Sequence, residues 1–113
     1  SLSTLGTQLA ARFERVDAVF GCAALLTKLG PLMHSPLLHL QQSLHLNVLA
    51  NATLLQTLHP LLSQASAPRA VFLLNPVDRV AKPFWAHYAA SQAALRALLT
   101  IYAQENPAIQ THL

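Results

Sequence analysis

An α/β fold built on a parallel sheet is the architecture that this sequence of 113 residues predicts. Two short apolar runs, residues 16–20 (VDAVF) and 70–74 (AVFLL), have the length and composition of buried strands. Stretches with helical spacing of apolar residues come before, between and after these two runs. This alternation favours parallel strands that are joined by right-handed crossover connections.

The first half of the chain predicts one short helix and one long helix. Residues 4–15 carry leucines and a phenylalanine at helical spacing. Ser35-Pro36 is typical of an N-cap followed by proline at the first helical position, so we expect a helix over residues 37–63. That helix is long enough to be two segments, and we expect a bend before or near Asn47.

Prolines set the remaining helix boundaries. Pro60 should end or kink the long helix, because proline lacks an N–H donor and its ring clashes with the preceding turn. After the second strand, Pro83 is expected to open a helix that runs to about Gln104, where Asn106-Pro107 stops it.

The composition is on the apolar side of ordinary proteins. Hydrophobic residues make up 53% of the chain and charged residues 10%, so we expect the surplus apolar surface to be buried in a protein interface. No apolar run reaches the length of a membrane span. The net charge of +3 comes from scattered basic residues, which predicts no nucleic-acid footprint.

Individual residue types exclude several kinds of site. The six histidines lack the spacing of a metal site. The three glycines, Gly6, Gly21 and Gly30, are too far apart to form a phosphate-binding loop. The single cysteine, Cys22, excludes an internal disulfide, favours a reducing, cytoplasmic location, and is expected to be a small buried residue. The amino terminus has no secretory signal pattern.

Polar side chains stand where a parallel sheet binds its ligands. Cys22 follows the first predicted strand and Asn75 follows the second, so both belong to the carboxyl edge of the sheet. Tyr88 lies at the start of the next helix, and Gln92 lies one turn later on the same face. Asn47 lies near the expected bend of the long helix. These residues are the candidate site.

These residues and their spacing resemble the short-chain dehydrogenase/reductase family. YAASQAAL around Tyr88 is similar to the family's YxASKAAL, and LNV around Asn47 is similar to its helix asparagine. The 13 positions from Asn75 to Tyr88 match the family's spacing from its serine to its tyrosine. LHPLL and AVFLL fall where the family has a helix end and the following strand, so the resemblance covers nearly the whole chain.

The resemblance implies a partial Rossmann-like, doubly wound parallel sheet, with two strands and three or four helices in this chain. Residues 1–113 are then expected to be a single partial domain. It would lack the family's amino-terminal glycine-rich cofactor unit and its carboxyl-terminal specificity loop, and the strand after the tyrosine helix would follow Leu113. An intact parent would bind NAD or NADP, and we expect neither to bind this chain alone.

The family's residue roles carry over by position. Tyr88 would be the general acid and base, and Asn47 would be the helix asparagine. Asn75 takes the place of the serine that orients the substrate carbonyl, and Gln92 takes the place of the lysine that binds the nicotinamide ribose. The family's Asn-Asn-Ala-Gly signature reads GCAA here. The implied cofactor-binding residues are Cys22, Ala23, Tyr88 and Gln92.

The departures from the family pattern bear on activity. A neutral Gln92 can hydrogen-bond a ribose hydroxyl, but it cannot stabilise a tyrosinate by Coulomb attraction. Asn75 can still donate an amide N–H to a carbonyl oxygen. We therefore expect an NAD(P)-dependent oxidoreductase of carbonyl or alcohol substrates that is catalytically impaired. The alternative is a non-catalytic relative that acts as a dimeric binding or scaffold protein.

Simpler interpretations of the same residues remain open. Tyr88 could be an ordinary interfacial tyrosine, and Asn75 could serve turn chemistry together with the proline that follows it. The apolar faces of the helices at about 44–63 and 83–104 could pack only on the sheet. The resemblance implies that these two helices also pair with their copies in a homodimer.

Overall fold

The computed structural model describes residues 2–22, 26 and 28–113. The described residues form an elongated molecule with extents of 49 × 27 × 17 Å. Along the chain the elements are α1 (Leu2–Arg12), β1 (Ala18–Gly21), the 3₁₀ turn η1 (Leu32–His34), α2 (Leu37–Leu44), the π-helical segment η2 (His45–Leu49), α3 (Ala50–Leu62), β2 (Arg69–Phe72), α4 (Val77–Val80), α5 (Ala86–Glu105) and β3 (Gln110–His112).

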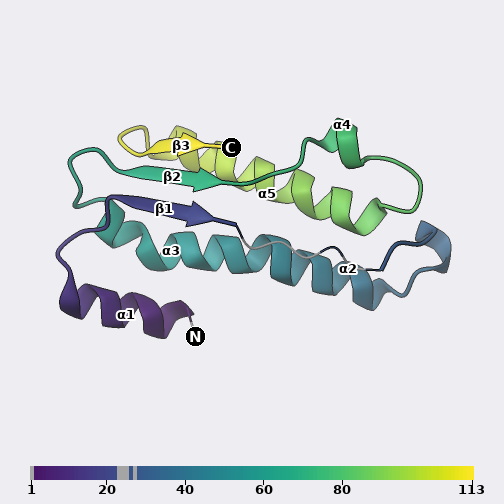
Figure 1. Ribbon diagram of the computed structural model, residues 1–113, viewed down its shortest axis with the longest axis horizontal. Helices are drawn as coiled ribbons and strands as arrows, with labels where there is room; N and C mark the ends of the chain where they lie inside the picture. Colours follow the sequence, from purple (N-terminus) through teal and green to yellow (C-terminus); the bar gives the residue numbers. More distant parts are fainter. Residues whose placement is uncertain (1, 23–25, 27) are drawn as a thin grey trace.

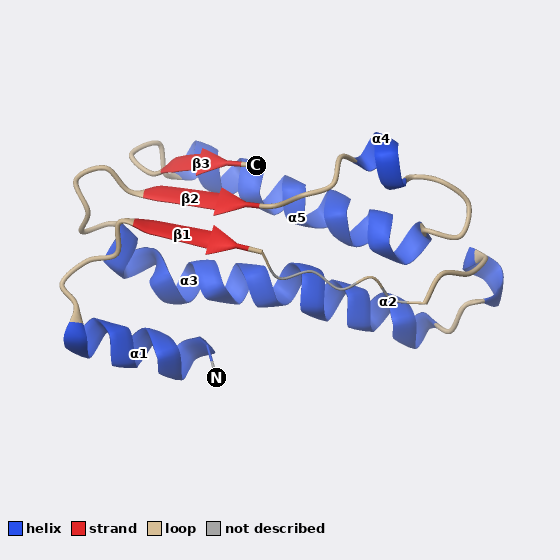
Figure 2. Ribbon diagram, viewed as in Figure 1, coloured by secondary structure: helices blue, strands red, loops and turns tan. Residues whose placement is uncertain are grey.

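The strands form one parallel sheet in the order β1-β2-β3, which confirms the predicted α/β class. Val19 pairs with Ala70, and Ala70 pairs with Thr111. The long helical segment α2-η2-α3 connects β1 to β2, and α5 connects β2 to β3 (Figures 1 and 2). Because all three arrows point the same way, the carboxyl ends of β1 and β2 meet at one edge (Figure 2).

The prediction of two strands was wrong, since β3 is a third strand within the chain rather than beyond Leu113. After α5 the chain turns through the Ile109 N–H to Asn106 carbonyl hydrogen bond of 3.0 Å. The Gln110 N–H then donates to the Pro68 carbonyl at 3.0 Å and aligns β3 with β2. The strand has three residues, Gln-Thr-His, and no apolar run marks it in the sequence.

Several predicted boundaries also shift. The first helix covers Leu2–Arg12 rather than 4–15. Ser35 does not cap α2, because its hydroxyl donates to the Pro31 carbonyl at 2.7 Å instead. Pro83 does not open α5, which begins at Ala86. The residues before α5 form a turn in which the Trp85 N–H donates to the Lys82 carbonyl at 3.1 Å.

The core lies between the sheet and the helices α3 and α5. Val19, Ala70 and Phe72 alternate inward along β1 and β2, where they meet buried leucines of the two helices, Leu55, Leu58, Leu62, Leu95 and Leu99. The sequence predicted buried strands, and within this chain only one face of each strand is buried. Phe20 is 66% exposed and Leu73 is 68% exposed, because the helices of this chain cover only one face of the sheet.

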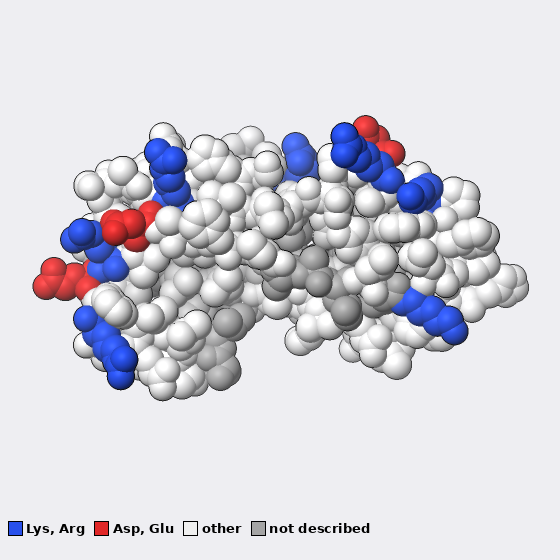
Figure 3. Space-filling model, viewed as in Figure 1, with Lys and Arg blue, Asp and Glu red and all other residues white. Residues whose placement is uncertain are grey.

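Charged side chains gather toward the two ends of the face drawn in Figure 3, and its middle carries few of them. The sequence gives the reason, because no Lys, Arg, Asp or Glu occurs between Lys28 and Arg69. The whole of α2, η2 and α3 is therefore uncharged apart from its histidines. Among the described residues, no helix is long and apolar enough to cross a membrane.

Candidate active site

The carboxyl edge of the sheet brings Asn75 and Tyr88 into direct contact. Asn75 follows the end of β2, and Tyr88 lies in the first turn of α5. The Asn75 amide Nδ2 donates to the Tyr88 phenol oxygen at 2.5 Å. Tyr88 is buried, with 8% of its surface exposed, whereas Asn75 is exposed, so this contact lies at the surface end of a buried phenol. The structure therefore joins two of the residues that the sequence selected.

Gln92 joins Asn75 and Tyr88 through its side-chain oxygen rather than through its N–H donors. Its side-chain oxygen Oε1 accepts a hydrogen bond of 2.9 Å from the backbone N–H of Asn75. Gln92 is 2% exposed, so this bond satisfies a polar group in a protected place. A lysine has three donors and no acceptor, and it could not take this N–H. Gln92 is thus an acceptor that ties α5 to the end of β2.

Asn47 lies at the centre of η2, where the predicted bend was placed. This π-helical segment separates α2 from α3, and such irregular turns are frequent at functional sites. The Asn47 carbonyl accepts from the Asn51 amide Nδ2 at 2.8 Å. The Asn47 amide Nδ2 donates to Ser43 at 3.2 Å and to Ser91 at 3.0 Å. Asn47 therefore reaches α5 through Ser91.

The residues after β1 differ from the prediction in their burial. Cys22 is exposed rather than a small buried residue, because it lies just beyond the strand end. Gly21, which precedes it, is buried against Phe72 and Asn51. Ala23, the other implied cofactor-binding residue of this segment, lies outside the described residues.

An aromatic side chain that the sequence did not select stands beside Tyr88. The rings of Trp85 and Tyr88 meet edge to face, with centroids 6.0 Å apart and an angle of 78°. The Lys82 ammonium lies 4.4 Å from the centroid of the Trp85 ring. The WAHY sequence places Trp85 three residues before Tyr88, and helical spacing could have indicated this contact.

Ser43 and Ser91 were also missed. Both are fully buried and lie between the long helical segment and α5. Ser43 is four residues before Asn47, and Ser91 is three residues after Tyr88, so each lies one helical turn from a selected residue. Within the described part of the chain, no group of three His, Cys, Asp or Glu side chains is placed to hold a metal.

The turn before α5 contains a strained residue, Phe84, with φ of 77°. Left-handed backbone costs a residue with a Cβ roughly 1–2 kcal/mol, and glycine is free of that cost. We predict that Phe84→Gly is more stable than Phe84→Ala by about 1 kcal/mol, although alanine normally stabilises a chain relative to glycine. Urea unfolding of both variants checks this order, and a more stable alanine variant would contradict it.

Tyr102 gives a pH dependence of stability. Burial raises the pKa of Tyr102 above the ordinary tyrosine value of about 10. Its phenol oxygen also lies 2.7 Å from His59 Nδ1. The folded state favours the neutral phenol. The stability that Tyr102 contributes is therefore complete below about pH 10, and it is lost as the pH rises through the pKa of Tyr102 in the folded state. Unfolding free energies should therefore fall more steeply above about pH 10 than in Tyr102→Phe, and equal slopes would contradict the assignment.

Comparison with known proteins agrees with this geometry. The family model described as short chain dehydrogenase matches residues 1–110. The chain belongs to the short-chain dehydrogenase family. This match covers β1, β2, the long helical segment and the tyrosine helix, and it ends at the first residue of β3.

Individual relatives are similar over most of this chain. The oxidoreductase YciK of Escherichia coli K12 is 32% identical over 101 residues, which are 89% of this chain and 40% of YciK. A short-chain dehydrogenase structure from Salmonella enterica serovar Typhi CT18 superposes with a TM-score of 0.88 at 29% identity, over 97% of this chain and 45% of that chain. A structure from Escherichia coli CFT073 in complex with NADPH gives the same TM-score and identity, over 96% and 45%. The chain spans less than half the length of these relatives.

Proposed function

We propose that the protein is an NAD(P)-dependent oxidoreductase that interconverts a carbonyl and an alcohol, with Tyr88 as the proton donor and acceptor. The observation that carries this proposal is the hydrogen bond from the Asn75 amide to the Tyr88 phenol at the carboxyl edge of the sheet. Family membership and the NADPH bound to the Escherichia coli CFT073 relative support it. Residues 1–113 are then a partial domain of the active protein.

The residues at this edge fit the nicotinamide side of such a cofactor in part. Tyr88 offers a hydroxyl and Gln92 offers an amide N–H, both able to bond ribose hydroxyls. The described residues contain no glycine-rich turn that could cradle a pyrophosphate. A bound nicotinamide supplies or takes the hydride. Asn75 orients the substrate carbonyl, and Tyr88 holds the proton that its oxygen gains or loses.

We propose that activity is impaired and that Gln92 is the cause. Its amide oxygen is committed to the Asn75 N–H, and it brings no positive charge to the Tyr88 phenol. An adjacent cation stabilises an anionic oxygen by Coulomb attraction, and a neutral amide stabilises it only by a hydrogen bond. Proton transfer by Tyr88 is therefore slower than in a site with lysine at this position.

The test uses the protein at its natural length. NADPH and NADH binding are measured by fluorescence, and hydride transfer is measured as loss of absorbance with a panel of aldehydes and ketones. We expect saturable binding of one cofactor and slow turnover that Tyr88→Phe removes. The absence of both binding and turnover would reject the enzyme and leave the non-catalytic alternative.

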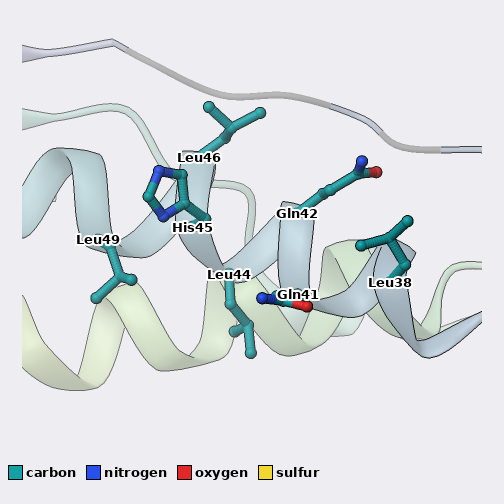
Figure 4. A pocket seen from close by; sticks show the side chains of 7 residues that line it. All are labelled: Leu38, Gln41, Gln42, Leu44, His45, Leu46 and Leu49. Atoms are coloured by element: carbon teal, nitrogen blue, oxygen red, sulfur yellow. The ribbon is translucent and has the colours of Figure 1, made fainter.

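We further propose that two copies pair through the long helical segment and α5, at about residues 44–63 and 83–104. Large apolar side chains stand exposed on these two helices, notably Leu49, Leu98 and Ile101. An open hollow of about 480 Å³ lies along α2 and η2, lined mainly by leucine and glutamine side chains (Figure 4). A second copy presents the same surface, in which residues 44–63 carry no Lys, Arg, Asp or Glu and residues 83–104 carry one, the exposed Arg96, so pairing buries these leucines and desolvates little charge.

Sedimentation at micromolar concentration tests this pairing. Leu49 is exposed on the proposed interface, and Leu49→Lys should shift the protein toward the monomer because it buries a charge there. Gln8→Lys adds the same charge on the exposed side of α1 and should leave the dimer intact. A monomeric parent, or equal effects of the two variants, would exclude this interface.

The second candidate is a cytoplasmic dimeric binding or scaffold protein without catalysis. The observation that favours it is that the exposed apolar side chains of the helices are present while the Gln92 oxygen is bound to the Asn75 backbone N–H. A protein that dimerises but binds neither NADPH nor NADH would fit this function.

A further inference from the structure

A buried set of hydrogen bonds joins the long helical segment to the first turn of α5. Asn47 stands at its centre, and its Nδ2 donates to the hydroxyls of Ser43 and Ser91. Ser43 in turn donates to the His87 carbonyl at 3.2 Å. Ser91 donates to the Tyr88 carbonyl at 2.8 Å. The Asn47 amide therefore starts two hydrogen-bonded chains, called arms below. One runs through Ser43 and the other through Ser91, and they end on the adjacent carbonyls of His87 and Tyr88.

Every side-chain hydrogen-bond donor of Ser43, Asn47 and Ser91 is used in these bonds. The amide nitrogen of asparagine carries two hydrogens, and each arm uses one. Each serine hydroxyl accepts from Asn47 and passes its own hydrogen onward. Ser43, Asn47 and Ser91 are all 0% exposed, so water cannot replace a lost bond. A fully satisfied buried polar set of this kind fixes the relative position of the elements that it joins.

We infer that Ser43 and Ser91 are positioning residues for Tyr88, acting through the backbone of His87 and Tyr88. The inference rests on the proposed function, in which Tyr88 carries the proton. The two carbonyls belong to the turn that presents the phenol to Asn75 and the Trp85 ring. Without the Ser43 or the Ser91 hydroxyl, one of these bonds is lost and the turn can shift relative to η2. The edge-to-face contact between Trp85 and Tyr88 then changes as well.

Trp85 is a direct reporter, because its ring contacts the Tyr88 ring edge to face. The natural-length protein is labelled with 5-fluorotryptophan, and the Trp85 resonance is assigned by its loss in Trp85→Phe. We expect Ser43→Ala and Ser91→Ala each to move or broaden this ¹⁹F resonance while the far-UV circular dichroism stays native. Restoring a hydroxyl with Ser43→Thr should return the resonance toward its original position.

Ser63→Ala is the matched control. It also removes a hydroxyl that donates to a helix carbonyl, that of His59 at 3.0 Å, but this one is exposed and away from α5's first turn. It should leave the Trp85 resonance unchanged. If an alanine variant does not fold, Ser43→Cys and Ser91→Cys keep the shape with a weaker donor and should give the same displacement.

An unmoved Trp85 resonance in folded Ser43 and Ser91 variants would overturn the inference, even if their stability falls. This outcome is separate from failure of the proposed function. The fluorine measurement needs no cofactor, and absence of NADPH binding would leave the displacement of Trp85 in place.

Discussion

The double variant Asn75→Ser with Gln92→Lys should reduce carbonyl substrates with NADPH about ten- to a thousandfold faster than the parent. A nearby cation lowers the pKa of an acidic group by roughly 1 to 3 units, and a more acidic phenol gives its proton to the carbonyl oxygen faster, by up to about that factor of ten to a thousand. The lysine supplies the cation, and the serine supplies a short hydroxyl donor in place of the Asn75 amide. Initial rates at saturating NADPH measure the gain.

Single variants separate the contributions. Gln92→Lys alone leaves the Asn75 N–H without the acceptor that it now has at 2.9 Å. Because Asn75 is exposed and this bond is only partly buried, its loss should cost roughly 1 kcal/mol of stability while the variant gains the cation. Gln92→Glu keeps the acceptor with the opposite charge and should gain no rate. Adding Tyr88→Phe to the double variant should abolish the gain, and a gain that survives it would remove Tyr88 from the mechanism.

Gly21→Ala should destabilise the fold by about 3 kcal/mol, the upper part of the range for overpacking. A Cβ at Gly21 would lie 2.2 Å from the Phe72 ring and 2.9 Å from the Asn51 side-chain oxygen. Phe72 is fully enclosed in the core, so the ring cannot move aside without disturbing its neighbours. The free energy of unfolding in urea measures the loss.

Gly30→Ala is the control for this substitution. Its Cβ would meet one atom, the Ser35 hydroxyl oxygen at 3.0 Å, which is the end of an exposed side chain and can rotate away. It should change stability by less than about 1 kcal/mol. Equal losses for the two glycines would contradict the close packing of β1 on Phe72.

The sequence predicts the class of fold and much of the site for physical reasons. Apolar runs bounded by helical patterns mark buried parallel strands, so β1 and β2 were located within two residues. The spacing from Asn75 to Tyr88 indicated a contact that the structure contains. Asn47 likewise lies in the irregular segment that the length of the helix suggested.

Other features depend on tertiary contacts that local patterns do not encode. The short strand β3 is positioned by backbone bonds to Pro68 and to β2 rather than by apolar side chains. Ser43 and Ser91 are ordinary helical serines until the two helices meet. The choice of the Asn75 backbone as the partner of Gln92 also arises only from the fold. A pattern of residue types predicts which groups are present, and packing decides which atoms they use.

Cofactor binding and turnover, measured side by side on the natural-length protein, test the central claim most directly. The account predicts saturable NADPH or NADH binding together with turnover at least about tenfold below that of the Asn75→Ser, Gln92→Lys variant. Parent turnover equal to that of the double variant, or no binding of either cofactor, would contradict it.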